Sequence, residues 1–174
     1  MSKPQRKLTT ILATDCVNYS GMMEDNEQET FIGIKACRKI IEDTIKEYDG
    51  RVFNTAGDSV IAEFNSPVDC VNSAIEFQQL IGDRNKNFAD NRQMKFRVGV
   101  HLDDVIVEGD DIFGGGVNIS ARLEGLCEPN CILISKAVHE YIVKKVNTII
   151  EHMGERNLKN MDDSISVYQI LKSN

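Results

Sequence analysis

The sequence predicts one α+β domain with a ferredoxin-like βαββαβ core, followed by additional strands and helices toward its C-terminal end. Two kinds of pattern predict this order. Short β-branched runs alternate with two long amphipathic stretches, and the run that closes the core alternates strictly between apolar and polar residues. The 174 residues are within the size of one domain, so we assign 1–174 to a single unit with its core at about 7–170.

The first strand and the first helix open the core. A β-branched apolar run predicts a strand over residues 7–13, which ends just before Asp15. A long helix is predicted from Glu24 to the break at Asp49-Gly50, because apolar residues recur there at spacings of three and four. Those residues are Phe31, Ile34, Cys37, Ile41 and Ile45.

A hairpin and a second helix follow. Residues 51–54 and 59–64 are extended runs, and the turn between them contains Asp58. Ser66-Pro67 is a typical helix start, with a capping serine and a proline at the first helical position. The apolar face of this second helix consists of Cys70, Ala74, Phe77 and Ile81.

The remaining elements complete the core and extend it. Residues 96–102 alternate as a strand, and Asp103-Asp104 predicts a turn into a partner strand at 105–107. We expect the core helices to pack on one face of a mainly antiparallel sheet. The C-terminal part adds a helix at 117–126, a strand at 131–134, a helix capped by Ser135 and short closing strands.

Charge and composition exclude some classes of protein. With 27 acidic and 20 basic residues the net charge is −7, which is unlike a sequence-independent nucleic-acid binder, so we expect no nucleic-acid partner. No apolar run is long enough for a membrane segment, and the N-terminal residues lack the apolar core of a signal peptide. The five cysteines are odd in number and scattered, which favours reduced thiols over a metal site. We therefore expect a cytoplasmic protein, or the cytosolic domain of a larger or membrane-attached one.

Two aspartates stand where predicted core strands meet turns. Asp15 follows the first strand and Asp58 lies in the hairpin turn, so they converge if their strands are neighbours. A close pair of carboxylates is suited to hard divalent cations held together with substrate phosphates. The alternative is that each aspartate bonds to the backbone of its own turn, and the spacing alone does not decide between the two.

Three polar residues downstream are further candidates. Asn118 and Arg122 share one helical face at a spacing of four, and a guanidinium recognises phosphate oxygens. Arg122 is equally compatible with a solvated charge near Glu124. Lys159 lies in a polar stretch before the last strand, where exposed lysines are common. We assign no role to the three histidines.

Taken together, these segments resemble the catalytic domain of the class III nucleotidyl cyclases, the adenylate and guanylate cyclases. The resemblance extends from about residue 7 to residue 170, and its motifs occur in the family's order. They are Asp15-Cys-Val-Asn-Tyr-Ser20, Ala56-Gly-Asp-Ser-Val-Ile-Ala-Glu-Phe64, Phe96-Arg-Val-Gly-Val-His101, Asp111-Ile-Phe-Gly114, Val117-Asn-Ile-Ser-Ala-Arg-Leu123 and Leu158-Lys159.

The resemblance implies the nucleotidyl cyclase fold and an adenylate cyclase, which converts ATP to 3′,5′-cyclic AMP and pyrophosphate in intracellular signalling. It implies two Mg²⁺ or Mn²⁺ ions and a homodimer, because the family builds each site from two subunits. No regulatory region is recognisable in this sequence. The implied roles are Asp15, Asp58 and the Cys16 backbone for the metals, Asn118 and Arg122 for catalysis, Asn54 and Asp111 for the base, and Asn18, Tyr19, Ser20 and Lys159 for the phosphates.

One position departs from the family pattern. Adenylate cyclases commonly place a lysine four residues before the second metal aspartate, and here that position is Asn54. Asp111 still favours adenine, since a carboxylate accepts from the exocyclic amine, whereas the amide of Asn54 can reverse its donor and acceptor ends. A guanylate or mixed-specificity cyclase therefore remains an alternative. So do a catalytically silent nucleotide-binding cyclase-homology domain and a binding module without catalysis.

Overall fold

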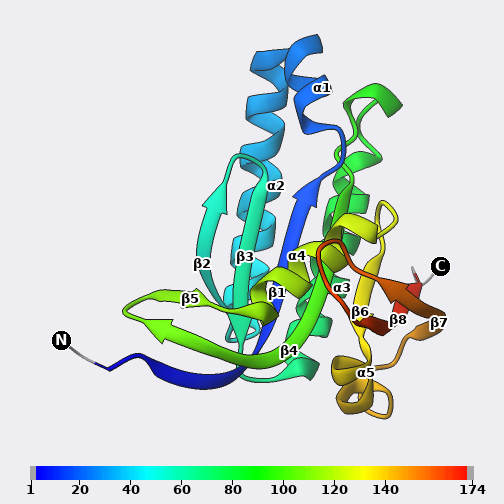
Figure 1. Ribbon diagram of the computed structural model, residues 1–174. Helices are drawn as coiled ribbons and strands as arrows, with labels where there is room; N and C mark the ends of the chain where they lie inside the picture. Colours follow the sequence, from blue (N-terminus) through cyan, green and yellow to red (C-terminus); the bar gives the residue numbers. More distant parts are fainter. Residues whose placement is uncertain (1–2, 172–174) are drawn as a thin grey trace.

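The computed structural model describes residues 3–171, which form one eight-stranded sheet with helices on both faces (Figure 1). The predicted ferredoxin-like core is confirmed: its strands lie side by side in the order β2-β3-β1-β4, and each neighbouring pair is antiparallel. The core elements are β1 (Gln5–Cys16), α1 (Tyr19–Asp25), α2 (Glu27–Glu47), β2 (Arg51–Ala56), β3 (Ser59–Phe64), α3 (Pro67–Asn85) and β4 (Phe96–Glu108).

The C-terminal part extends the sheet beyond β4. Strand β6 is parallel to β4, β8 is antiparallel to β6, and β7 forms the edge beside β8, while β5 pairs with the end of β4. These additions to the ferredoxin-like core are the ones that the sequence predicts in type. They are β5 (Asp111–Phe113), α4 (Gly115–Leu126), β6 (Ile132–Ser135), α5 (Lys136–Ile142), β7 (Ile149–Asn157) and β8 (Ser164–Leu171).

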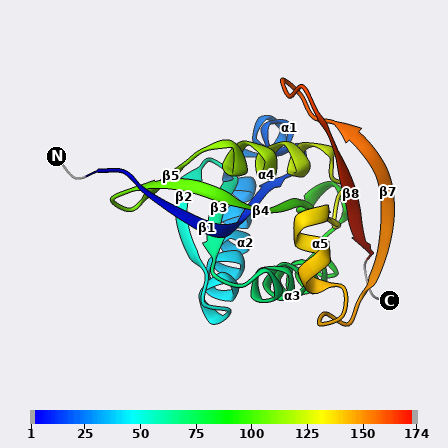
Figure 2. The ribbon, with the colours of Figure 1, turned by 60° about the horizontal axis from the view of Figure 1, so that its bottom comes forward.

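Helices cover the two faces of the sheet unequally. The main apolar core joins α2, α3 and α5 to one face, whereas α4 lies on the opposite face (Figure 2). The prediction that the helices share one face therefore holds for α2 and α3, and α4 adds a second layer. Helix α4 reaches β4 closely because Gly99 has no side chain: a Cβ there would overlap the Ser120 carbonyl and the Glu124 amide nitrogen.

The predicted turn at Asp103-Asp104 is wrong. Strand β4 runs without a break through both residues, which pair with Thr9 and Leu8 of β1. Strand β1 begins at Gln5 and supplies ladder partners for residues 96–107 of β4, and this pairing outweighs the local turn preference of two aspartates. The chain turns instead at Gly109 and Asp110, and β5 forms the second arm of the hairpin.

The helix predicted from Glu24 is two helices. Asn26 separates α1 from α2, and its side chain accepts a hydrogen bond from the Glu29 amide, which fixes the start of α2. Phe31, placed on the apolar face by spacing, is 53% exposed and lies against Lys35. Ser135 occupies the N-cap of α5 but does not cap it with its side chain, because its Oγ is hydrogen-bonded to His101 Nδ1.

Two expectations from composition bear on the described residues. Between residues 3 and 171, no helix is both long and apolar enough to cross a membrane. Cys16, Cys37, Cys70 and Cys127 are free thiols, which agrees with the predicted reduced state, and all four are buried.

Candidate functional site

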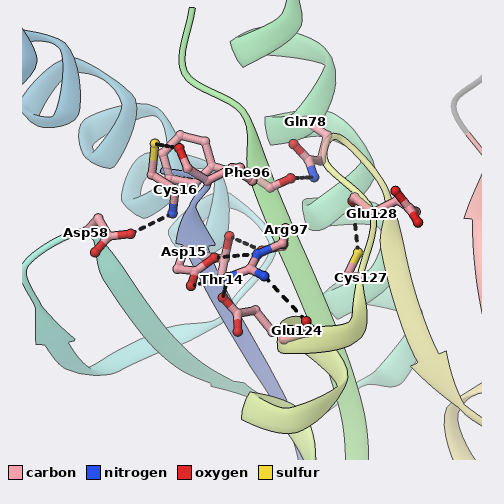
Figure 3. Close-up of polar contacts among 12 residues, drawn as sticks. Thr14, Asp15, Cys16, Asp58, Gln78, Phe96, Arg97, Glu124, Cys127 and Glu128 are labelled. Atoms are coloured by element: carbon pink, nitrogen blue, oxygen red, sulfur yellow. Dashed lines mark hydrogen bonds and ion pairs between the residues drawn. The ribbon is translucent and has the colours of Figure 1, made fainter. Parts of the chain in front are cut away.

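The two candidate metal aspartates are brought together at one end of the central strands. Asp15 is the penultimate residue of β1, and Asp58 follows Gly57 in the β2–β3 turn, where the glycine has a φ of 60°. The link between them is Cys16, whose amide donates a hydrogen bond to Asp58 Oδ2 at 2.8 Å (Figure 3). The alternative of two unrelated turn aspartates is therefore wrong for Asp58, which bonds to a neighbouring strand.

Arg97 of β4 is the partner of Asp15. Its Nε and Nη2 donate to Asp15 Oδ1 and Oδ2 at 3.0 and 2.8 Å, a bidentate pair across directly paired strand positions. The hydrogen bond to Asp15 raises the pKa of Arg97 above its usual value. The guanidinium thus places a permanent positive charge beside the Asp15 carboxylate.

A third carboxyl group, from α4, adjoins this pair. Glu124 Oε1 lies 3.7 Å from Arg97 Nη2, and it is buried without a hydrogen-bond partner. Burial, together with Asp15, raises the pKa of Glu124 to about 9, so this carboxyl is protonated at neutral pH. The close approach of α4 at Gly99 is what brings Glu124 to the end of β1.

The chemistry of the donors fits Mg²⁺ or Mn²⁺. Asp15, Asp58 and the backbone of Cys16 offer only hard oxygen ligands, because burial raises the pKa of the Cys16 thiol to about 12 and keeps it from acting as a thiolate. Over the part of the chain that the structure describes, no three His, Cys, Asp or Glu side chains form a metal-holding group by themselves. Such a sparse site suits Mg²⁺, which is usually held by one or two carboxylates together with substrate phosphates.

The predicted phosphate loop lies next to these donors. Asn18 adopts the left-handed conformation with a φ of 56° and precedes Tyr19 and Ser20, the first residues of α1. Tyr19 packs partly against the main core, whereas Asn18 and Ser20 are exposed. The loop therefore presents backbone groups and two short polar side chains toward solvent beside Asp15.

Asn118, Arg122 and Lys159 are not brought to the aspartates. Asn118 and Lys159 are exposed on α4 and after β7, and Arg122 is half-buried. Glu124 faces Arg97 and Asp15. A helix turns about 100° per residue, so Arg122, two positions earlier, lies on nearly the opposite face of α4. Within one chain, Arg122 therefore faces away from Asp15.

The candidate base-reading residues lie on β2 and β5. Asn54 is exposed in β2, next to a bulge at Phe53 where the pairing with β3 shifts by one residue. Asp111 begins β5, is exposed, and accepts a hydrogen bond from the Ile112 amide through Oδ1. Strands β2 and β5 contact each other.

Arg97 and Glu124 were not predicted as site residues. The alternation along β4 carries a signal for Arg97, since Phe96, Val98 and Val100 all face the core and leave Arg97 on the other face. No sequence signal indicates that Glu124, rather than Arg122, is the residue of α4 that meets Asp15.

The comparisons with known proteins decide the family. The model of the adenylate and guanylate cyclase catalytic domain matches residues 1–172. The chain belongs to this family. The resemblance inferred from the motifs is therefore confirmed, and the protein is a nucleotide cyclase domain.

Individual relatives agree with that assignment. The chain is 36% identical over 165 residues to the Rhizobium meliloti (strain 1021) protein named "Putative adenylate cyclase 3", covering 94% of this cyclase and 28% of that relative. An adenylate/guanylate cyclase/hydrolase structure from Silicibacter pomeroyi has a TM-score of 0.92 at 31% identity and covers 98% of this chain and 100% of that one. The adenylyl cyclase CyaB from P. aeruginosa shares the fold, with a TM-score of 0.87 at 19% identity over 99% of this chain and 98% of that one.

Proposed function

We propose that this cyclase converts ATP to 3′,5′-cyclic AMP and pyrophosphate in composite sites of a homodimer, in intracellular signalling. The observation that carries the proposal is the junction of Asp15 and Asp58 through the Cys16 amide, which gathers hard oxygen donors beside an exposed polar loop. Asp15, Asp58 and the Cys16 backbone would hold two magnesium or manganese ions, which would lower the pKa of the ribose 3′-hydroxyl and neutralise charge on the triphosphate.

The orientation of α4 supports the homodimer. Arg122 faces away from Asp15 of its own chain, so only a second copy can bring Arg122 to these aspartates. A two-fold axis then gives two equivalent sites, each with metal donors from one chain and Asn118, Arg122 and Lys159 from the other. One chain alone is inactive in this scheme.

Each chain residue has a defined task in the proposed reaction. Asn118 orients the ribose so that its 3′-oxygen is in line with the α-phosphorus and the leaving pyrophosphate. The 3′-hydroxyl gives up its proton to solvent water as its oxygen bonds to the α-phosphorus, and the bond from phosphorus to pyrophosphate breaks. Arg122 neutralises the charge that grows on the α-phosphate, and Lys159 binds the terminal phosphates together with the loop from Asn18 to Ser20.

The choice of ATP rests on the base-reading pair. The Asp111 carboxylate retains Oδ2 to accept a hydrogen bond from an exocyclic amine. Asn54 can donate to a ring nitrogen, yet its reversible amide also suits guanine, and this favours a mixed-specificity cyclase as the second candidate.

Cyclic nucleotide formation at graded protein concentrations tests the proposal. Purified chain is given ATP or GTP with Mn²⁺, and dimer content is measured at each concentration. We expect cyclic AMP, with activity per chain rising as the dimer forms. Comparable turnover of GTP would favour the mixed-specificity candidate. If a demonstrated dimer forms neither cyclic AMP nor cyclic GMP, the proposal is contradicted and a silent nucleotide-binding domain is favoured.

A further inference from the structure

A β-bulge determines which face of the sheet Asn54 occupies. Val52 pairs with Ala62, but Asn54 pairs with Ile61, so Phe53 is the extra residue. Cross-strand partners share a face, and without the bulge Asn54 would oppose Val60, which belongs to the buried main core. The bulge therefore moves Asn54 to the face of Ile61, over which β5 folds.

Apolar packing joins β2 to β5 on that face. The third apolar cluster consists of buried Ile11, Val105 and Ile112, with Phe53 and Ile61 packed against it. Ile112 follows Asp111 directly, and Phe53 precedes Asn54 directly. The two candidate base-reading residues are thus each one position from a side chain of the same cluster.

Arg51 adds a polar bridge between the same two strands. Its Nε donates to Glu63 Oε1 at 2.9 Å, and its Nη1 donates to the Asp110 carbonyl at 2.9 Å. The Glu63 side chain is only 9% exposed and also pairs with Lys7, so it is a fixed anchor. One end of the guanidinium is therefore held in the sheet while the other holds the turn that leads into Asp111.

We propose that Arg51 is a positioning residue for base selectivity, fixing the turn that carries Asp111 relative to Asn54. The inference rests on the proposed function, since it takes these two residues as the base readers. A guanidinium suits the task because it is planar and donates from separate nitrogens in two directions, whereas the ammonium of lysine donates from one nitrogen and cannot span both acceptors.

Arg51→Lys separates this role from simple stabilisation. The lysine retains a charge for Glu63 but loses the second donor to Asp110. The matched control is Arg6→Lys, because Arg6 pairs with Asp104 in the same sheet and is exposed, with no link to β5. Arg51→Met, which removes both bonds, is the second variant.

The readout is the ratio of dissociation constants for fluorescent mant-ATP and mant-GTP, measured with Mn²⁺ and the full chain. For Arg51→Lys we expect the preference for ATP to fall about threefold to tenfold, the effect of one hydrogen bond. Hydrogen exchange over residues 109–113 should become faster, while the melting temperature stays near that of wild type. Arg6→Lys should leave the ratio and the exchange unchanged.

The outcomes distinguish this inference from the proposed function. The role of Arg51 would be overturned if the ratio of dissociation constants is unchanged in both folded Arg51 variants, or if Arg6→Lys changes it equally. It would also be overturned if wild type binds the two nucleotides with equal affinity. If wild type binds the two nucleotides with different affinities but forms no cyclic product, only the proposed reaction is contradicted. Wild-type chain that binds neither nucleotide would overturn both.

Discussion

Arg97 donates hydrogen bonds to both carboxylate oxygens of Asp15, from Nε to Oδ1 at 3.0 Å and from Nη2 to Oδ2 at 2.8 Å. A cation that binds Asp15 must compete with this guanidinium for the same oxygens. Glu124 Oε1 is buried 3.7 Å from Arg97 Nη2, and the Glu124 carboxyl also interacts with Asp15. The metal end of the site therefore combines three acidic side chains with one arginine, and Asp58 is joined to it through the Cys16 amide.

The raised pKa of Glu124 predicts a pH dependence of stability. The pKa lies at about 9 in the folded chain, against an ordinary value of 4.5, chiefly because the group is buried and then because Asp15 is near. Between these two pKa values the folded chain holds a proton that the unfolded chain has lost. The free energy of unfolding therefore falls as pH rises through this range. Above about pH 9 the stabilisation that comes from protonated Glu124 is lost.

Glu124→Gln checks this dependence by removing the titrating group without changing its shape. In urea unfolding without divalent cations, we expect wild type to lose stability relative to the variant as pH rises from about 5 to about 9. The exposed Glu128, changed to Gln, is the control and should follow wild type. Parallel stability curves for wild type and Glu124→Gln would show that the carboxyl is ionised in the folded state.

The close packing of α4 against Gly99 predicts that a larger residue at this position lowers stability. An alanine Cβ there would overlap backbone atoms of Ser120 and Glu124, so α4 must move, and we expect a loss of about 1–3 kcal/mol in the free energy of unfolding. Gly125→Ala is the matched control on the same helix, because its Cβ meets nothing within 4 Å, and it should gain up to about 1 kcal/mol. Denaturant unfolding measures both, and equal stability of the two variants would refute the close approach.

The sequence predicts the core well where its signals are local. The order of strands and helices follows from apolar periodicity, and the Asp58 hairpin and the Ser66 cap follow from turn and capping residues. The continuity of β4 through Asp103 depends on pairing with β1, a partner almost a hundred residues away, which local turn preference does not reveal. Apolar spacing does not reveal the break at Asn26, because residues 24–30 are all polar.

The candidate site divides in the same way. The aspartates were predicted from their places at strand ends, and their junction at Cys16 agrees with that prediction. Arg97 and Glu124 entered only with the three-dimensional structure, because their roles depend on β1 pairing with β4 and on the approach of α4 at Gly99. The roles of Asn54, Asp111, Asn118, Arg122 and Lys159 stay predictions.

Base reading predicts a gain of selectivity in Asn54→Lys. A lysine donates but cannot accept, which removes the reversibility of the amide, so we expect the preference for ATP over GTP to rise about tenfold. The ratio of kcat/KM values for the two nucleotides measures it. Thr55→Ser, a change at the neighbouring exposed position, is the control. An unchanged ratio in Asn54→Lys would remove Asn54 from base reading.

Composite sites predict complementation between two inactive variants. Asp15→Ala and Arg122→Ala should each lack activity, because each destroys one half of both sites. Mixed in equal amounts, half of the dimers are mixed and each has one intact site, so about a quarter of wild-type activity should return. Pull-down of differently tagged chains verifies that mixed dimers form. If they form and stay inactive, the sites are not shared between chains.

The measurement that tests the central claim most directly is cyclic AMP formation by wild type and Asp58→Asn, with ATP and Mn²⁺ at a concentration where the dimer is present. Asparagine still accepts the Cys16 hydrogen bond, so the turn is preserved while the metal-binding charge is lost. We predict turnover by wild type and a loss of at least about a hundredfold in the variant. Equal turnover by the two proteins would contradict catalysis by metals at Asp15 and Asp58.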